Sequence, residues 1–231
     1  MRFALPSLLA LCALVLCALV LFTGLDGVGW TDAREARDAR VAGELILHRE
    51  PLTPLYAGDA WFEKPVLAYA PEIVARLWPG SRAPASPLRS RQIRVVAALA
   101  LLLVTGALAA RRFGARAGAW SAIVLLSTLG LPFATRADGT QLFATLLGWS
   151  ACAAFAPCLW SASRGTMVRL LGGYLALAAA LLVAGPWAAL WPLAGVALYA
   201  ALARDRAALA RVRPLPGLLI MIGAALPWYG A

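Results

Sequence analysis

Charged residues other than arginine are scarce in this sequence of 231 residues, which has one histidine and one lysine, His48 and Lys64. A lone histidine has no second ligand at a useful spacing, so we interpret His48 as a solvated or interfacial residue and predict no metal ligands. Carboxylates are more numerous, and they leave a bound divalent cation open as an alternative. Nothing else in the sequence indicates a cofactor.

Cysteine is also rare, and its positions exclude two classes of small protein. The four cysteines all lie inside apolar runs: Cys12, Cys17, Cys152 and Cys158. They are therefore interpreted as small buried hydrophobic residues. The sequence predicts neither a disulfide framework nor a zinc site.

Acidic residues are nearly absent outside one stretch of the chain. Of the 11 acidic residues, only Asp138 and Asp205 lie outside residues 26–91. The chain is 62% hydrophobic, which exceeds what a soluble domain of this size can bury, so the sequence predicts an integral membrane protein. Its net charge of +10 comes from arginines clustered at the ends of apolar runs. Arginines so placed orient a membrane protein, so we exclude nucleic acid as a partner.

The apolar runs predict an all-α membrane protein with about seven transmembrane helices. The first, over residues 1–25, is long enough to cross the bilayer, with a cleaved signal peptide as the alternative. A long outer loop over 26–91 follows, and then a six-span bundle over 92–231, so that 1–231 forms a single transmembrane domain. The six later spans are expected at 93–110, 117–134, 140–158, 167–184, 186–203 and 214–230. We also considered 167–203 as one hairpin with a tight Gly-Pro turn.

The arginines predict the orientation of these spans, because basic residues in short loops stay on the cytoplasmic side. One side collects ten arginines, whereas the short loops of the other side have only Arg136. We therefore expect a multi-pass protein of the inner membrane, with a cytoplasmic N-terminus and membrane lipids as neighbours. The 26–91 loop then lies on the periplasmic face.

Within the outer loop, two interfacial helices are expected. The first covers 31–47, where apolar positions recur with partial helical periodicity. The segment 52–59 is predicted to be irregular or extended because proline and glycine interrupt it. Pro65 suits the first turn of a second helix over 66–78, and 81–90 is expected to be a linker.

Four short motifs in the chain resemble a known enzyme family. They are Asp32-Ala33-Arg34-Glu35-Ala36-Arg37, Val41-Ala42-Gly43-Glu44, Phe62-Glu63-Lys64-Pro65 and Arg136-Ala137-Asp138. In order, spacing and membrane side, they are similar to the polyprenyl-phosphate-sugar-dependent glycosyltransferases of the GT-C fold. The nearest group is the aminoarabinose (lipid A) transferases, with the protein O-mannosyltransferases as more distant relatives. The aromatic-Glu-Lys-Pro element is the most specific of the four.

The resemblance implies a reaction and a role for each motif. An acceptor hydroxyl attacks the anomeric carbon of a lipid-linked sugar, so the site needs a base for the proton and a cation for the departing phosphate. By resemblance, Asp32 is the leading general base and Glu35 orients the acceptor or shares that role. Lys64 and Arg136 hold the donor phosphate.

Three further residues are expected to support the site. Glu63 orients Lys64, Asp138 positions Arg136 or the acceptor, and Arg37 matches an arginine of the family.

Each assignment has a structural alternative. Asp32 and Glu35 have the spacing of a helix capping box. Glu63 and Lys64 fit an exposed ion pair of little energetic value. Arg136 and Asp138 fit caps at the ends of membrane spans. Arg37 fits a partner of acidic neighbours or of lipid headgroups.

The sequence also departs from the family in places. The interval between Asp32 and Glu35 is wider than in many relatives, and Val183-Ala184-Gly185 stands where a lysine is common. Relatives continue with further spans, so the chain corresponds to the N-terminal half of such an enzyme, and a C-terminal half or a partner subunit is expected.

The predicted function is sugar transfer from a polyprenyl-phosphate-linked donor to a hydroxyl of a lipid or protein acceptor. The alternative is a non-catalytic or fragmentary membrane subunit that binds a polyprenyl lipid or a partner protein.

Overall fold

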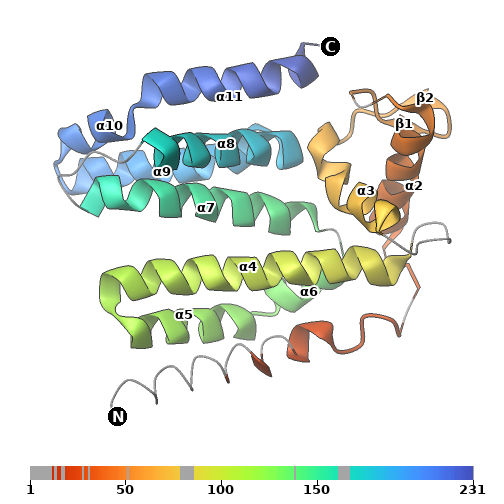
Figure 1. Cartoon of the computed structure of the whole chain (residues 1–231), viewed down its shortest axis with the longest axis horizontal. Coiled ribbons are helices and arrows are strands. Elements are labelled where there is room, and N and C mark those ends of the chain that lie inside the picture. The colour runs from red at the N-terminus through yellow and green to blue at the C-terminus, as the bar shows by residue number, and fades with distance from the viewer. Residues whose placement is uncertain are drawn as a thin grey trace. The chain divides into compact units, whose positions relative to one another are not determined.

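The chain is mostly helical in the computed structural model (Figure 1). The structure describes residues 12, 15–16, 19–27, 29–30, 32–50, 52–78, 86–137, 139–160 and 167–230. These residues divide into two compact units. The first comprises Met1–Gly43 and Ala70–Leu142, and the second comprises Glu44–Tyr69 and Phe143–Ala231.

The first unit contains most of α2 (Ala33–His48), together with α3 (Ala70–Leu77) and α4 (Pro87–Phe113). Helix α2 confirms that the segment expected over 31–47 is helical, and its place at the membrane surface stays a prediction. Helix α4 begins earlier than predicted, because proline at a first helical position is already fixed in helical φ and needs no N–H partner. The predicted linker over 81–90 is therefore wrong for its last four residues, which form the first turn of α4.

Helices α4 and α5 (Ala115–Ser127) form a tight antiparallel pair. A Cβ placed on Gly118 would lie 2.6 Å from the carbonyl oxygen of Gly106, so the backbones touch where both residues lack side chains. Gly114, at φ 93°, makes the turn between the two helices. Small residues at such a contact are the usual means of close helix packing in lipid.

The predicted span over 117–134 is broken into two helices. Helix α5 ends at Ser127, and α6 (Gly130–Arg136) starts after a bend of 59°. Pro132 lies in the first turn of α6, where the missing N–H costs little, but it cannot lie deep inside a continuous helix without disrupting it. The proline therefore favours a helix start at this place.

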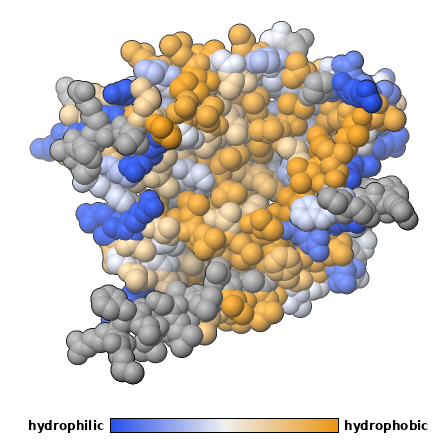
Figure 2. Space-filling model, in the orientation of Figure 1, coloured by the Kyte–Doolittle hydropathy of each residue, from blue (hydrophilic) through white to orange (hydrophobic). Residues whose placement is uncertain are grey.

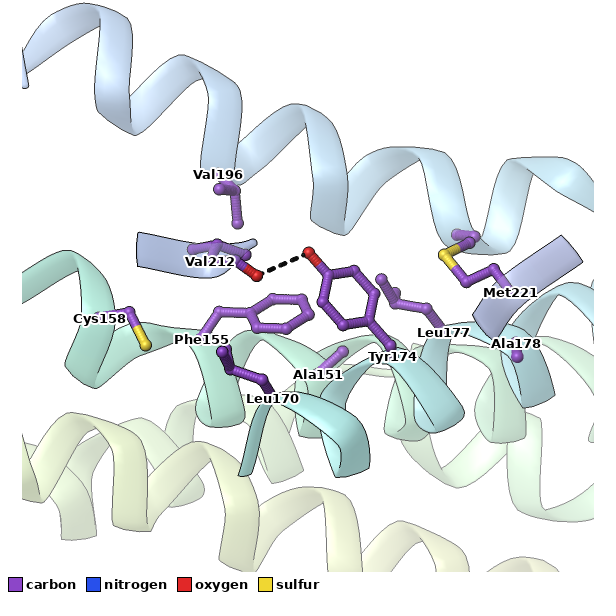
Figure 3. Close-up of a cluster of buried hydrophobic side chains, with 11 residues drawn as sticks. Ala151, Phe155, Cys158, Leu170, Tyr174, Leu177, Ala178, Val196, Val212 and Met221 are labelled. Carbon is purple, nitrogen blue, oxygen red and sulfur yellow. Dashed lines mark hydrogen bonds between the residues drawn. The ribbon is translucent and has the colours of Figure 1, made fainter. Parts of the chain in front are cut away.

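The second unit is built around α7 (Thr140–Trp160), α8 (Met167–Ala184), α9 (Pro186–Leu202) and α11 (Pro214–Tyr229). Figure 3 shows its largest buried cluster, in which the rings of Phe155 and Tyr174 pack with centroids 5.0 Å apart. Gly217 of α11 lies directly against the Tyr174 ring, so α11 packs on α8 at a position without a side chain. A short helix that the sequence analysis did not expect, α10 (Arg206–Val212), joins α9 to α11.

A small β-hairpin precedes these helices in the second unit. Strand β1 (Leu55–Tyr56) pairs antiparallel with β2 (Asp59–Ala60), so the segment predicted to be irregular or extended contains a two-residue turn. Both turn residues, Ala57 and Gly58, have positive φ, and the carboxylate of Glu44 accepts their backbone N–H groups at 2.9 and 3.1 Å. The expected second interfacial helix follows as a 3-10 turn, η1 (Val66–Tyr69), and then α3.

Several of the described helices are long enough to span a membrane. Helices α4, α7 and α8 are long and apolar enough to cross a bilayer, the bent pair α5 and α6 makes a fourth candidate, and α9 and α11 are shorter apolar helices. In Figure 2, hydrophobic residues cover the middle of the helices and hydrophilic residues lie toward their ends. Each of the six spans predicted after the outer loop thus corresponds to an apolar helix or to the bent pair. The predicted first span lies largely outside the described residues, although residues 19–22 are helical.

Candidate functional site

Glu35, in the first turn of α2, is the most deeply buried charged residue described in the first unit. Its side chain is 0% exposed and accepts hydrogen bonds from two arginines of α4. Arg94 Nη1 lies 2.7 Å from Glu35 Oε1, and Arg91 Nη2 lies 3.0 Å from Oε2. Helix α2 is therefore tied to the start of α4 by both oxygens of one carboxylate.

Arg94 also reaches two other elements of the first unit. Its Nη2 donates to Glu72 Oε1 of α3 at 2.6 Å, and its Nη1 donates to the carbonyl oxygen of Ala137 at 2.5 Å, directly after α6. Glu72 accepts a further hydrogen bond from the hydroxyl of Ser90. A single guanidinium thus fixes α2, α3 and the chain after α6 to α4.

Arg91 completes the cluster on the side of the N-terminal segment. Its Nη1 donates to Leu25 O at 2.9 Å, and its Nη2 donates to Gly29 O at 2.6 Å. We call the cluster of Glu35, Glu72, Ser90, Arg91 and Arg94 the buried ion network. Its two cations and two anions balance, which is the condition under which charges persist away from water.

Asp32 lies immediately before α2 and is partly exposed. Its Oδ1 accepts the backbone N–H of Arg34 at 2.9 Å, as the aspartate at the N-terminus of a helix does. The aspartate of the capping-box alternative therefore does cap the helix through its side chain. Both carboxylate oxygens of Glu35, the other proposed member of the box, accept from Arg91 and Arg94.

Arg136, at the end of α6, binds the end of the N-terminal helical segment. Its Nη2 donates to Thr23 O at 2.7 Å and its Nη1 donates to Pro132 O at 3.0 Å. A guanidinium at the carbonyl end of a helix offsets the partial negative charge there. This is the capping role that the sequence left open beside phosphate binding, and Asp138 lies outside the described residues.

Glu63 and Lys64 belong to the second unit, in the segment before η1. Glu63 is exposed and Lys64 is half-buried. The neighbouring Phe62 ring packs on Trp228 of α11 with centroids 5.7 Å apart, and Pro65 O accepts the N–H of Ala68 to open η1. The aromatic-Glu-Lys-Pro motif is thus held at both ends, by a ring contact and by a helix start.

The candidate residues therefore form two groups. Asp32, Glu35, Arg37 and Arg136 lie in the first unit, where Asp32 and Glu35 share the first turn region of α2 and Arg37 is partly buried on the same helix. Glu63 and Lys64 lie together in the second. Among the described residues, no group of three or more histidine, cysteine, aspartate or glutamate side chains could hold a metal ion.

Sequence reasoning missed four members of the buried ion network: Glu72, Ser90, Arg91 and Arg94. One signal was present, because Arg91 and Arg94 are three residues apart at the head of an apolar span and so share one helix face. A pair of arginines on the same face of a membrane helix needs acidic partners.

Comparison with known proteins gives a fold. No protein-family model matches the chain, and no curated protein matches it. Among solved structures, it is similar to ArnT from Cupriavidus metallidurans in the apo state, with a TM-score of 0.81 and 22% identity over 95% of this chain and 40% of that one. The same protein bound to undecaprenyl phosphate matches with a TM-score of 0.83 and 20% identity over the same shares. The chain therefore has the fold of part of a GT-C polyprenyl-phosphate glycosyltransferase and spans 40% of its length.

Proposed function

Since the chain has the fold of part of a GT-C glycosyltransferase, we propose that it is the catalytic N-terminal part of a membrane glycosyltransferase. The reaction moves a sugar from a polyprenyl-phosphate donor to a hydroxyl of a lipid or protein acceptor. The observation that carries this proposal is the likeness to ArnT, including its complex with undecaprenyl phosphate. The motifs quoted from the sequence supply independent support.

In the proposed reaction, the acceptor oxygen forms a bond to the anomeric carbon while the bond from that carbon to the phosphate oxygen breaks. The acceptor proton passes to Asp32, and the phosphate leaves with the electron pair of the broken bond. Asp32 suits this role because it is partly exposed at the start of α2, and its Oδ2 takes no part in the bond to Arg34.

Glu35 has a different role in this proposal from the one suggested by sequence alone. Its carboxylate is buried and accepts from two guanidinium groups, so it is a positioning residue and not a base. The buried ion network fixes the first turn of α2 against α4, and Asp32 stands one residue before that helix. Apolar residues can often replace a buried ion network with little loss of stability. We therefore propose that the charges are kept because they position α2.

Lys64 and Arg136 are the proposed cations for the donor phosphate. Lys64 is the only lysine of the chain, and a compact ammonium offers three donors to phosphate oxygens. Arg136 is the second proposed cation, because its planar guanidinium matches the geometry of phosphate oxygens. Glu63, Asp138 and Arg37 remain supporting residues in the proposal.

The site would face the periplasm from the inner membrane, where lipid-linked donors are used. To test the function, membranes containing the full gene product are supplied with undecaprenyl-phosphate aminoarabinose and lipid A, and transfer is measured. We expect Asp32→Asn and Lys64→Ala to abolish transfer. Asp59→Asn, at an exposed carboxylate of β2, is the matched control and should retain it.

A second function rests on the likeness to the complex of ArnT with undecaprenyl phosphate, which by itself implies binding and not transfer. A non-catalytic subunit would bind undecaprenyl phosphate without transferring sugar. Thermal stabilisation by undecaprenyl phosphate with no turnover would support this alternative. Transfer that persists in both site variants would contradict the residue assignment, and absence of both binding and transfer would reject the glycosyltransferase proposal.

A further inference from the structure

One end of the second unit is strongly basic. Between residues 160 and 215, the sequence contains six arginines and a single acidic residue, Asp205. The end comprises the last turn of α7, the first turn of α8, the last turn of α9, α10 and the start of α11. An excess of cations at one helix end concentrates anions beside it.

Helix α10 crosses this end of the unit between two sharp turns. Arg204 and Arg213 flank the helix with φ of 53° and 55°, the left-handed region that non-glycine residues seldom occupy. The two left-handed residues end α9 before α10 and end α10 before α11, so α10 is a separate helix that contacts α9. Both flanking residues are arginines.

Four hydrogen bonds hold α10 in place. Asp205 Oδ1 accepts the N–H of Ala208 and caps the helix at 3.1 Å. Arg211 donates to Asp205 Oδ2 at 2.6 Å and to Cys158 O of α7 at 2.7 Å. The Tyr174 hydroxyl donates to Val212 O at 3.0 Å, as Figure 3 shows. The helix is therefore a fixed platform, and the only acidic side chain of this end is already engaged by Arg211.

A cavity of about 370 Å³ opens on this platform. Its lining consists of Ala207, Ala210, Arg211 and Arg213, and the Arg211 guanidinium already donates to Asp205 and to Cys158 O. A guanidinium group recognises phosphate oxygens through bidentate hydrogen bonds. Because Arg211 is paired with Asp205, Arg213 is the cation that the cavity offers to a phosphate group.

Large apolar side chains are exposed on the helix termini at this end of the unit. Val168, Leu202 and Leu215 are 80%, 77% and 76% exposed, at the ends of α8, α9 and α11. Arg213 Nη1 lies 4.0 Å from Met167 Sδ, which brings the start of α8 next to the cavity wall. A free phosphate ion gains nothing from exposed leucine and valine, whereas a phospholipid places acyl chains against them and its phosphate beside Arg213.

We propose that this cavity on α10 binds the phosphate of an anionic phospholipid of the surrounding leaflet, with Arg213 as the contacting cation and Arg211 fixing α10 beneath it. Basic pockets at the ends of membrane helices recognise such headgroups. This site is independent of the proposed sugar transfer, because it uses none of the residues assigned to that reaction.

The test compares lipid binding by the purified full chain in neutral detergent micelles. Phosphatidylglycerol and phosphatidylcholine with matched acyl chains are titrated, and bound lipid is counted by native mass spectrometry with the melting temperature as a second readout. We expect phosphatidylglycerol to bind more tightly than phosphatidylcholine. Arg213→Gln should weaken phosphatidylglycerol binding about fivefold, the effect of removing one basic residue at an anionic lipid surface.

Two variants separate charge from folding. Arg213→Gln keeps a non-glycine residue at the left-handed turn, so its lipid-free melting temperature should stay close to that of the parent chain. Arg213→Lys should retain most of the binding because it retains the charge. Arg116→Gln, at an exposed arginine of α5, is the control for the loss of one surface cation and should bind phosphatidylglycerol as the parent does.

Three outcomes would overturn the proposal. Equal binding of the two lipids would show that the phosphate site does not select anionic headgroups. Unchanged phosphatidylglycerol binding by Arg213→Gln would exclude the cavity. Stabilisation by inorganic phosphate alone, equal to that by phosphatidylglycerol, would show a site for the free ion and contradict the lipid assignment.

Discussion

Arg94 Nη1 and Glu35 Oε1 are 2.7 Å apart in a pair closed to solvent, which joins the first turn of α2 to the second turn of α4. The pair accounts for two charges that the membrane environment would otherwise disfavour. It also gives α2 a defined attachment at the end next to Asp32. The stability and the proposed chemistry of this region therefore depend on the same contact.

Glu35→Gln should destabilise the chain by about 3 kcal/mol, because a buried guanidinium pair loses its counter-charge. Thermal unfolding in detergent measures the effect, and Glu50→Gln, at an exposed carboxylate, should change it little. Loss of sugar transfer at an unaltered melting temperature would instead assign Glu35 to the reaction itself.

Arg136→Gln should lower stability by about 1 kcal/mol without any ligand, because the guanidinium caps the carbonyl end of the N-terminal helical segment. Arg34→Gln on the exposed face of α2 is the matched arginine control. If Arg136→Gln alters only the affinity for undecaprenyl phosphate and leaves the melting temperature unchanged, the capping role is wrong.

Acidification should weaken the attachment of α10. The hydrogen bond from Arg211 lowers the pKa of the Asp205 carboxyl below its ordinary value. The unfolded chain then binds the proton more readily, so the contribution of Asp205 is present above pH ~4, the ordinary aspartate range, and is lost as the pH falls through the lowered folded-state pKa.

The measurement for this pH dependence is the melting temperature of the parent chain and of Asp205→Asn across that range. The parent should be more stable at neutral pH, and the difference should vanish in acid. A difference that stays constant with pH would contradict the ion pair with Arg211.

Gly118→Leu should destabilise the α4 and α5 pair by roughly 1–3 kcal/mol, because a side chain there collides with the backbone of Gly106. Gly172→Leu in α8 is the control, since a Cβ at that position meets no atom within 4 Å. Equal melting temperatures for the two variants would show that the close approach of α4 and α5 is not required.

Orientation is open to a direct check with reporter fusions. The arginine distribution predicts that Gly58, in the hairpin, and Gly114, between α4 and α5, lie on opposite sides of the membrane. A periplasm-active reporter should be active only at Gly58. Activity at both positions would contradict the predicted topology.

Hydrophobic periodicity predicted the helices of this chain closely because long apolar runs leave few alternatives in a membrane. Each of the six apolar runs after the outer loop is a described helix or the bent pair, three or four of them long enough to span a bilayer, and the helix expected over 31–47 corresponds to α2. The break between α5 and α6 was missed because apolar character continues through it, although Pro132 marked the place. The family resemblance led correctly to the GT-C fold.

Contacts between distant residues were beyond the sequence. Glu35 and Arg91 are 56 residues apart, and no local pattern pairs them. Ala57 does not signal a turn by itself, because the carboxylate of Glu44 supplies the hydrogen bonds that hold its positive φ. Helix α10 is too short to show a periodic pattern of apolar residues, so the sequence indicated only a basic loop there.

The buried ion network has a consequence for how the chain is made. Both of its glutamates, on α2 and α3, precede both of its arginines on α4 in the order of synthesis. When Arg91 and Arg94 leave the ribosome, their counter-charges already exist, and no later segment is needed to neutralise them. The charged head of α4 can therefore be settled at the membrane surface before α5 has been translated.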